Sequence, residues 1–237
     1  AVKKKNGKLR FCGDYRTLNA VTKDESFPLP DLLSNINKLK GCSIYSTLDG
    51  KDAFNTIKIK KEDRPKTAFY GVDDLWQWIK MPFGLKNAPI EYSKLIEKAL
   101  AGCDPKHVHK YLDDIIIASQ DMDHHCQMLE EVLKAHREAG LSIQPTKSHL
   151  FQDNADYLGH HVTKEGIEPL KDYVSIVEQW PLPANLRQLR AFLGKLGYYR
   201  KFIQDYTTKV EPLQKLTCKP YLDQPYHLDE AAQQAFL

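Results

Sequence analysis

The chain has 237 residues, and its 42% hydrophobic and 27% charged residues provide enough apolar material for one large or two moderate globular domains. Five widely spaced cysteines without a CxxC pair indicate neither a disulfide framework nor a zinc ribbon, and they favour a reducing compartment. No apolar run approaches the length of a membrane span, so a membrane partner is not expected.

The basic residues gather in three clusters, although the formal net charge is only +3. Basic clusters with tyrosine and phenylalanine between them are typical of a nucleic-acid track. Runs of charge are more often simply solvated faces, so both interpretations stay open. The clusters comprise Lys3, Lys4, Lys5, Lys8, Arg10 and Arg16; Lys58, Lys60, Lys61, Arg64 and Lys66; and Arg187, Arg190, Lys195, Arg200 and Lys201.

The first predicted element is a hairpin, because Asn6-Gly7 lies between two strand-like segments. Lys4 and Arg10 then lie on opposed strands close to the turn. Such a hairpin is either a basic finger that grips a triphosphate or a charged loop in solvent, and the local sequence favours neither.

A helix is predicted over residues 30–40, and it is followed by a strand that begins at Cys42 and ends at Asp49. An aspartate at a strand end is suited to bind a metal, because the strand holds it rigidly. Asp52 is a second candidate, and its alternative role is to support the turn after this strand.

Further helices are predicted over residues 90–100, where Tyr92 lies on the apolar face, and over 122–139, with Gly140 as the C-cap. A hairpin is predicted through Asp73-Asp74, residues 156–162 are predicted to form one arm of another hairpin, and a strand over 141–143 precedes Lys147. The expected buried side of the second helix comprises Met122, Leu129, Val132, Leu133 and His136.

Two adjacent carboxylates, Asp113 and Asp114, lie between Tyr111-Leu112 and the apolar run 115–118. These flanks predict two strands, so the acidic pair falls at a hairpin turn. A divalent cation such as Mg²⁺, which prefers hard oxygen ligands, would relieve the repulsion between the like charges. An ordinary Asp-Asp turn at the surface explains this stretch alone equally well.

The pattern changes after about residue 168. A basic amphipathic helix is predicted over 186–193, with Asn185 as its N-cap and Gly194, Gly197 and Tyr198 after it. Small residues on a basic helical face permit close approach, either to a duplex minor groove or to another helix. Before this change, the order of strands and helices predicts an α+β fold with helices on one face of a sheet.

Three carboxylates could hold two magnesium ions if Asp49 and the Asp113-Asp114 pair meet at one end of the sheet. One ion would lower the pKa of a primer 3′-hydroxyl, and the other would bind the triphosphate and steady the leaving pyrophosphate. Lys147 could protonate that pyrophosphate as a general acid. Sequence spacing alone does not establish that the carboxylates converge.

Several ordered motifs resemble a known family. Asp49, the loop 82–89 and the box Tyr111-Leu112-Asp113-Asp114 closely resemble reverse transcriptases. The loop around Phe83, the segment 157–160 and the segment 189–203 resemble the polymerase of Ty3/gypsy-type LTR retrotransposons. The resemblance extends from about Val2 to Cys218.

This resemblance implies an α+β right-hand polymerase with fingers, a palm that is an antiparallel sheet with helices on one face, and a helical thumb. Fingers and palm interleave within residues 1–168, with the palm at about 41–54 and 81–168. The thumb is expected over 169–219, and a connection region is expected to start over 220–237.

Carried over residue by residue, the resemblance implies that Asp49, Asp113 and Asp114 are catalytic metal ligands for two Mg²⁺ ions, with Mn²⁺ as an alternative. The resemblance also implies that Phe54 excludes a ribose 2′-hydroxyl and that Phe83 packs near the incoming nucleotide. The other implied nucleotide and primer-end contacts are Lys4, Arg10, Gly50, Lys51, Asp52, Ala53, Tyr111 and Leu112. Leu158, Gly159 and His160 would form a primer grip, and the expected duplex contacts are Arg187, Arg190, Gly194 and Tyr198.

The implied function is a DNA polymerase that copies RNA or DNA templates by adding dNTPs to a primer 3′-hydroxyl. The implied partners are primer–template and the RNase H, integrase and protease domains of a longer Pol polyprotein. The implied location is the cytoplasm, inside virus-like particles, with a possible nuclear stage. The alternative hypothesis is a non-catalytic fragment that binds primer–template with steep salt dependence and no turnover.

Overall fold

The computed structural model describes residues 2–3, 7, 9–10, 12–28, 32–218 and 225–236. The chain divides into two compact units. The first comprises residues 1–158 and 162–167, and the second comprises 159–161 and 168–237. Two buried apolar clusters belong to the first unit and one belongs to the second, so each unit has its own core.

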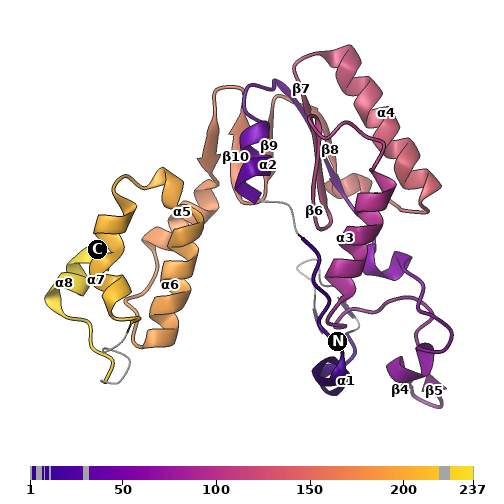
Figure 1. Ribbon diagram of the computed structural model, residues 1–237, viewed down its shortest axis with the longest axis horizontal. Helices are drawn as coiled ribbons and strands as arrows, with labels where there is room; N and C mark the ends of the chain where they lie inside the picture. The colour runs from indigo at the N-terminus through magenta and orange to yellow at the C-terminus, as the bar shows by residue number, and fades with distance from the viewer. Residues whose placement is uncertain are drawn as a thin grey trace. The chain divides into compact units, whose positions relative to one another are not determined.

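A four-stranded antiparallel sheet with the order β6–β7–β3–β8 organises the first unit (Figure 1). Strand β3 (Ile44–Asp49) pairs with β7 (Asp114–Ser119) on one side and with β8 (His149–Gln152) on the other. Strand β6 (Val108–Tyr111) pairs with β7 at the edge. The β-branched run in β7 favours a strand that is buried on both faces.

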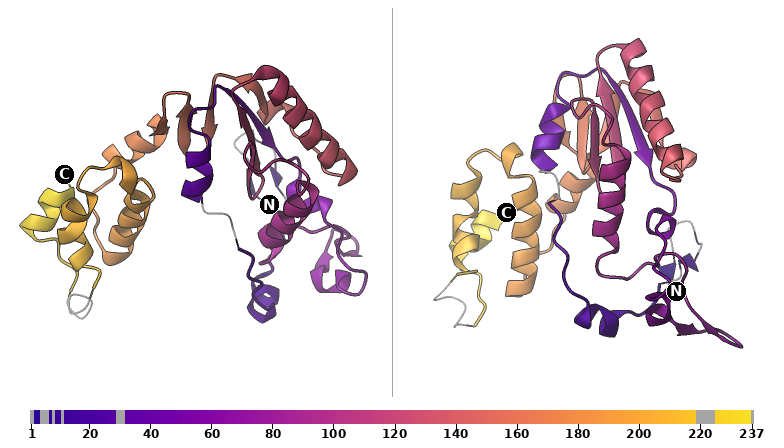
Figure 2. Two further views of the ribbon diagram at one scale, coloured as in Figure 1. Left: turned by 45° about the horizontal axis from the view of Figure 1, so that its top comes forward. Right: turned by 45° about the vertical axis from the view of Figure 1, so that its right-hand side comes forward.

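Both faces of this sheet are covered (Figure 2). One face packs against α3 (Ala88–Ala99) and α4 (Met122–Glu138), which supply residues of the first cluster. The opposite face packs against α2 (Leu32–Lys38) and β9 (Asn154–Tyr157). Alternation along β7 divides its isoleucines between the two clusters, because successive side chains in a strand point to opposite faces. Ile115 and Ile117 belong to the first cluster and Ile116 to the second.

Helix α4 matches its predicted ends. The Asp121 side chain accepts a hydrogen bond of 2.8 Å from the backbone nitrogen of His124, and Gly140 follows the helix with φ +67°. The predicted buried side is confirmed for Leu129, Val132 and His136. The predicted buried side was wrong for Met122 and Leu133, which are exposed. The buried face of α4 is narrow, and it also includes His125 and Met128, which were not predicted.

Shorter elements connect these helices and strands. They are β1 (Val2–Lys3) paired with β2 (Leu9–Arg10), α1 (Arg16–Val21), the 3-10 helices η1 (Ala53–Thr56) and η2 (Arg64–Thr67), and β4 (Phe69–Tyr70) paired with β5 (Leu75–Trp76). The predicted hairpin through Asp73-Asp74 is confirmed. For the first predicted hairpin, the pairing of β1 with β2 is confirmed, whereas Asn6 of its turn lies outside the described residues. The strand predicted over 141–143 is reduced to one bridge between Gly50 and Ile143, because the 3-10 helix η3 (Pro145–Lys147) begins directly after it.

A three-stranded sheet has the order β11–β10–β9, where β10 is His160–Thr163 and β11 is Ile167–Pro169. The prediction of one hairpin arm over 156–162 was wrong, because Leu158 and Gly159 adopt positive φ values and form the turn between β9 and β10.

The second unit is helical. It contains α5 (Lys171–Glu178), α6 (Leu186–Tyr198), the 3-10 helix η4 (Arg200–Phe202), α7 (Tyr206–Lys215) and α8 (Glu230–Phe236). Asn185 is the N-cap of α6 as predicted, because its side chain accepts a 3.0 Å hydrogen bond from the backbone nitrogen of Gln188. Leu189 and Phe192 of α6 pack with Leu228 and Ala232 in one core. Among the described residues, no helix combines the length and the apolar character that a bilayer crossing requires.

Candidate active site at the ends of strands β3 and β7

The structure brings the predicted carboxylates to one end of the central sheet. Asp49, the last residue of β3, pairs directly with Asp114, the first residue of β7. Side chains paired across antiparallel strands project to the same face, so these two carboxylates lie on the same side. Asp113 occupies the two-residue turn between β6 and β7, and both members of the acidic pair are exposed.

The turn that carries Asp113 has a strained backbone. Leu112 adopts φ 55°, in the left-handed region that favours glycine. A non-glycine residue in this region costs roughly 1–3 kcal/mol and is found most often where function over-determines the conformation. Half-buried Tyr111 and Leu112 therefore lie on a tightly constrained turn that holds Asp113 next to Asp114.

The electrostatics of this corner are dominated by negative charge. The protein packed around Asp114 raises its pKa to about 6, and the charges of Asp113 and Asp49 act in the same direction. Lys147 opposes this shift. The Lys147 Nζ lies 3.0 Å from Asp49 Oδ2, so one carboxylate of the three is neutralised by the predicted general acid.

The segment before β8 holds Lys147 beside Asp49. The Asp49 backbone nitrogen donates to Ser148 Oγ at 3.1 Å, and the Gln144 nitrogen donates to the Asp49 carbonyl at 2.8 Å. The Lys51 nitrogen donates to the Ser142 carbonyl at 2.8 Å. These bonds extend the pairing beyond the end of β3 and position residues 142–148 alongside the first carboxylate.

The donor set suits a hard divalent cation, because three carboxylates gather at one sheet end. Within the described ranges, no three histidine, cysteine, aspartate or glutamate side chains are already arranged as a metal-ligand group. A cation that binds here would replace the Lys147 contact with Asp49 and relieve the repulsion on Asp114. The chemistry of these residues therefore fits a hard divalent ion.

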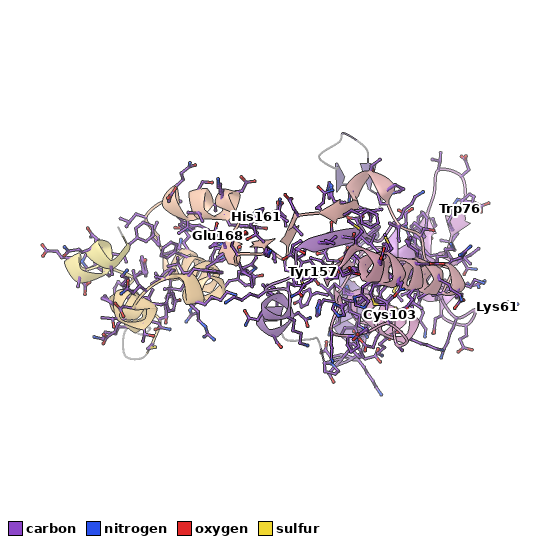
Figure 3. All side chains as sticks on the ribbon, turned by 90° about the horizontal axis from the view of Figure 1, so that it is seen from above. Lys61, Trp76, Cys103, Tyr157, His161 and Glu168 are labelled. Carbon is purple, nitrogen blue, oxygen red and sulfur yellow. The ribbon has the colours of Figure 1, made fainter. Side chains whose placement is uncertain are left out.

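A pocket of about 370 Å³ opens beside Asp49, Asp114 and Lys147. Tyr157, whose side chain is labelled in Figure 3, is 3% exposed and lines this pocket. Its hydroxyl has no hydrogen-bond partner among the described residues. Burial is the main cause that raises the pKa of Tyr157. Sequence reasoning placed Tyr157 in a hairpin arm and in a family motif, and nothing in its spacing indicated that it borders the carboxylates.

The residues predicted to contact the nucleotide follow Asp49 directly. Lys51 and Asp52 are exposed, and Asp52 has φ 51°, a left-handed conformation that leads into η1. Ala53 is buried, whereas Phe54 is half-buried and meets the ring of Phe83 edge-on at 5.4 Å between centroids. The structure thus brings the two predicted nucleotide-side aromatic residues into contact.

The ring of Tyr92 also packs edge-on against Phe54, with 6.1 Å between centroids. Tyr92 lies on α3 and is almost completely buried, and its hydroxyl approaches Gly50. Sequence reasoning counted Tyr92 as one apolar residue of a helix face. The signal in the sequence was the residue type at position 92. A tyrosine hydroxyl requires space beyond the end of the ring, and a phenylalanine ring does not.

A buried histidine connects the strands that carry the carboxylates. His125 of α4 lies 2.8 Å from the hydroxyl of Ser46 in β3 through Nε2 and 2.8 Å from that of Ser119 in β7 through Nδ1. The Phe151 nitrogen of β8 donates to Ser46 Oγ at 3.1 Å. Burial lowers the pKa of His125, so the neutral imidazole ties three strands of the sheet together.

The predicted triphosphate grip is described only in part. Arg10 lies in β2 and pairs with Val2, as the predicted hairpin requires. Lys4 lies outside the described residues.

The predicted primer grip is shaped by two left-handed residues, Leu158 with φ 49° and Gly159 with φ +77°. In the second unit, the Tyr199 hydroxyl donates to the Gly159 carbonyl at 3.0 Å. His160 is fully buried, and the rings of Tyr198, Tyr199 and Phe202 surround it at 5.4–5.6 Å. His160 therefore supports the hairpin from inside the protein.

Three predicted duplex contacts share one exposed face of α6. Arg187, Arg190 and Gly194 are exposed, and their spacing of three and four residues puts them on the same side of the helix. A Cβ added at Gly194 would meet nothing within 4 Å, so close packing against another described helix does not explain this glycine. Tyr198 is half-buried on the same helix.

Comparisons with known proteins agree with this geometry. Residues 2–162 match the family model described as reverse transcriptase (RNA-dependent DNA polymerase). The chain is 36% identical over 235 residues to a Pol polyprotein from transposon opus of Drosophila melanogaster, covering 96% of this chain and 23% of that protein. It is 34% identical over 218 residues to the transposon Tf2-3 polyprotein of Schizosaccharomyces pombe, covering 92% of this chain and 16% of that one.

Solved structures support the same fold. A foamy viral protease–reverse transcriptase in complex with double-stranded DNA matches with a TM-score of 0.87 at 24% identity, covering 99% of this chain and 41% of that chain. The native prototype foamy virus protease–reverse transcriptase matches with a TM-score of 0.59 at 27% identity, covering 99% and 31%. The predicted α+β right-hand polymerase fold is confirmed.

The fold and the family match define a reverse transcriptase domain, and the chain belongs to the reverse transcriptase family. The predicted resemblance to the enzymes of Ty3/gypsy-type LTR retrotransposons is also confirmed. The chain spans less than a quarter of the length of the curated Pol polyproteins described above.

Proposed function

We propose that this chain is the polymerase part of a retrotransposon Pol polyprotein, which extends a primer 3′-hydroxyl with dNTPs on RNA or DNA templates. The observation that carries this proposal is the pairing of Asp49 with Asp114 beside the Asp113 turn. Family membership supports the same reaction class.

The three carboxylates Asp49, Asp113 and Asp114 are proposed to hold two Mg²⁺ ions, with Mn²⁺ as an alternative. Bound divalent ions would supply Lewis-acid activation of the primer hydroxyl and neutralise charge on the triphosphate. Lys147 lies next to Asp49, so its ammonium group can shift from this carboxylate to the leaving pyrophosphate and protonate it.

The remaining predicted contacts position the substrates. Phe54, supported by Phe83, excludes a ribose 2′-hydroxyl by steric contact. Lys4 and Arg10 grip the triphosphate together with the backbone of residues 50–53. The constrained Tyr111-Leu112 turn lies beneath the primer end, and Leu158, Gly159 and His160 form the primer grip.

On the second unit, the arginines of α6 bind backbone phosphates while Gly194 allows close approach of the duplex. Tyr198 lies on the same helix and adds to this duplex contact. The residues that carry this role are Arg187, Arg190, Gly194 and Tyr198.

The domain assignment follows the family pattern. Fingers and palm lie within 1–168, the thumb over 169–219, and a connection region starts over 220–237. The partners are primer–template, dNTPs, and the RNase H, integrase and protease domains of the polyprotein. The proposed location is the cytoplasm, inside virus-like particles, with a nuclear stage.

Primer extension with the 237-residue chain tests the proposal, using an RNA template, dNTPs and Mg²⁺. Asp113→Asn should abolish extension and leave primer–template affinity nearly unchanged, because it removes a charge without changing shape. The matched control is Asp73→Asn, since Asp73 belongs to another exposed Asp-Asp turn between paired strands. Extension by Asp113→Asn at the control rate would contradict the proposal.

A further inference from the structure

The glycine that follows the first carboxylate faces the end of a buried tyrosine. A Cβ atom built on Gly50 would lie 2.6 Å from the Tyr92 hydroxyl oxygen and 3.7 Å from its Cζ. Cβ atoms in proteins essentially never approach a heavy atom of a residue that is not their neighbour in the chain more closely than 3.0 Å. The backbone oxygen of Asp113 lies 3.8 Å from the same point, so this contact is inside the carboxylate corner.

Backbone conformation does not explain a glycine at this position. Gly84 and Gly159 have positive φ values of +103° and +77°, which disfavour any other residue, but Gly50 is not in this region. Gly50 bridges Ile143 in an extended arrangement that an alanine also adopts. The space filled by the Tyr92 hydroxyl is therefore the reason in this structure that residue 50 lacks a side chain.

Tyr92 cannot easily move away from this contact. Its side chain is 2% exposed and belongs to the main core cluster beneath the sheet. Its ring packs edge-on against Phe54, the residue proposed to exclude the ribose 2′-hydroxyl. Burial, with the charges of Asp113 and Asp49, raises the pKa of Tyr92 to about 12, so the hydroxyl stays neutral beside the carboxylates.

We propose that Tyr92 is a positioning residue of the nucleotide site, whose hydroxyl fills the space of a side chain at position 50 while its ring supports Phe54. Tyr92 and Gly50 thus act as a complementary pair. The hydroxyl sets how closely α3 approaches the residue after Asp49. The ring fixes the position of Phe54, which is proposed to exclude the ribose 2′-hydroxyl. This inference rests on the proposed function for its catalytic readout.

A double-mutant cycle tests the pair. Gly50→Ala should lower the melting temperature and reduce kcat/KM by roughly tenfold, because it overpacks the corner. Tyr92→Phe removes only the hydroxyl, and in this background Gly50→Ala should cost much less melting temperature and kcat/KM than it does beside Tyr92. The control is Gly102→Ala, since Gly102 is exposed, lacks a positive φ and has nothing within 4 Å of a built Cβ.

Additive effects would contradict the pairing. In that case Gly50→Ala would lower the melting temperature by the same amount whether residue 92 is tyrosine or phenylalanine. Melting temperatures can be measured without catalysis. A chain that folds but never extends a primer would therefore contradict the proposed function, and the melting-temperature comparison would still test the pairing of Gly50 with Tyr92. The ring is tested separately. Tyr92→Leu should weaken discrimination between dNTPs and rNTPs by at least about tenfold, whereas Tyr92→Phe should retain it. Unchanged discrimination in Tyr92→Leu would refute the support of Phe54.

Discussion

A buried histidine in the edge strand of the hairpin that carries Asp113 makes the first unit sensitive to acid. His109 of β6 is 3% exposed, and no hydrogen-bond partner for its Nε2 is found in the described part of the chain. Burial is the largest cause that lowers its pKa from 6.5 to about 4, and the nearby charge of Lys38 adds to the shift. Replacing His109 with leucine removes both the titrating group and the unpaired nitrogen.

The sign follows from proton linkage. A histidine whose pKa is lowered by folding contributes stability that is complete above the pKa of the unfolded chain and is lost as pH falls towards the folded value. With values of 6.5 and about 4, the loss falls between these two pH values. Between pH 7 and pH 5 it amounts to about 2 kcal/mol.

Urea unfolding at pH 7 and pH 5, followed by tryptophan fluorescence, measures this effect. His109→Leu should lose about 2 kcal/mol less than the wild type between these pH values, because only the wild type must protonate this buried ring. The control is His227→Leu in the second unit, where the side chain is exposed. If His109→Leu loses as much stability as the wild type, His109 is not held neutral by burial and the reasoning fails.

Three further predictions concern the site. Lys147→Gln should lower kcat by at least about 10²-fold, because it removes the proposed general acid. The same substitution should change the free energy of unfolding by less than about 1 kcal/mol, because the ion pair of Lys147 with Asp49 is partly exposed. An unchanged kcat at saturating dNTP would exclude the general-acid role. His125→Leu should destabilise the chain by about 2–4 kcal/mol in urea unfolding, because the buried Ser46 and Ser119 hydroxyls each lose one hydrogen-bond partner. Stability within about 0.5 kcal/mol of wild type would contradict this. Arg190→Ala should reduce by about 1 the slope of log affinity for primer–template against log salt, and an unchanged slope would show that this face of α6 does not bind phosphate.

Much of the frame could be predicted from the sequence because local signals and tertiary packing agree there. The β-branched run 115–118, the predicted capping residues Gly140 and Asn185, and the Asp113 turn each specify their element through short-range chemistry. The pairing of Asp49 with Asp114 did not follow from spacing, since strand partners distant in sequence are set by the whole sheet. The prediction that these two carboxylates converge came from the family resemblance and not from the periodicity.

The features that the sequence did not reveal are contacts that side chains make only in the folded protein. Tyr92 looked like any apolar residue of a helix face, and its contact with Gly50 exists only after α3 packs beneath the sheet. The position of Tyr157 beside the carboxylate pocket and the contact of Lys147 with Asp49 likewise join segments that are far apart in the chain. The predicted strand over 141–143 was wrong because Pro145 starts a 3-10 helix too soon for a ladder to form.

The most direct test of the central claim is calorimetric titration of Mg²⁺ into the chain bound to primer–template and a non-hydrolysable dNTP analogue. Because three carboxylates gather at one sheet end, the wild type and the control Asp73→Asn should bind two ions, and Asp49→Asn should lose measurable binding of at least one. Two ions bound by Asp49→Asn with wild-type affinity would contradict the account.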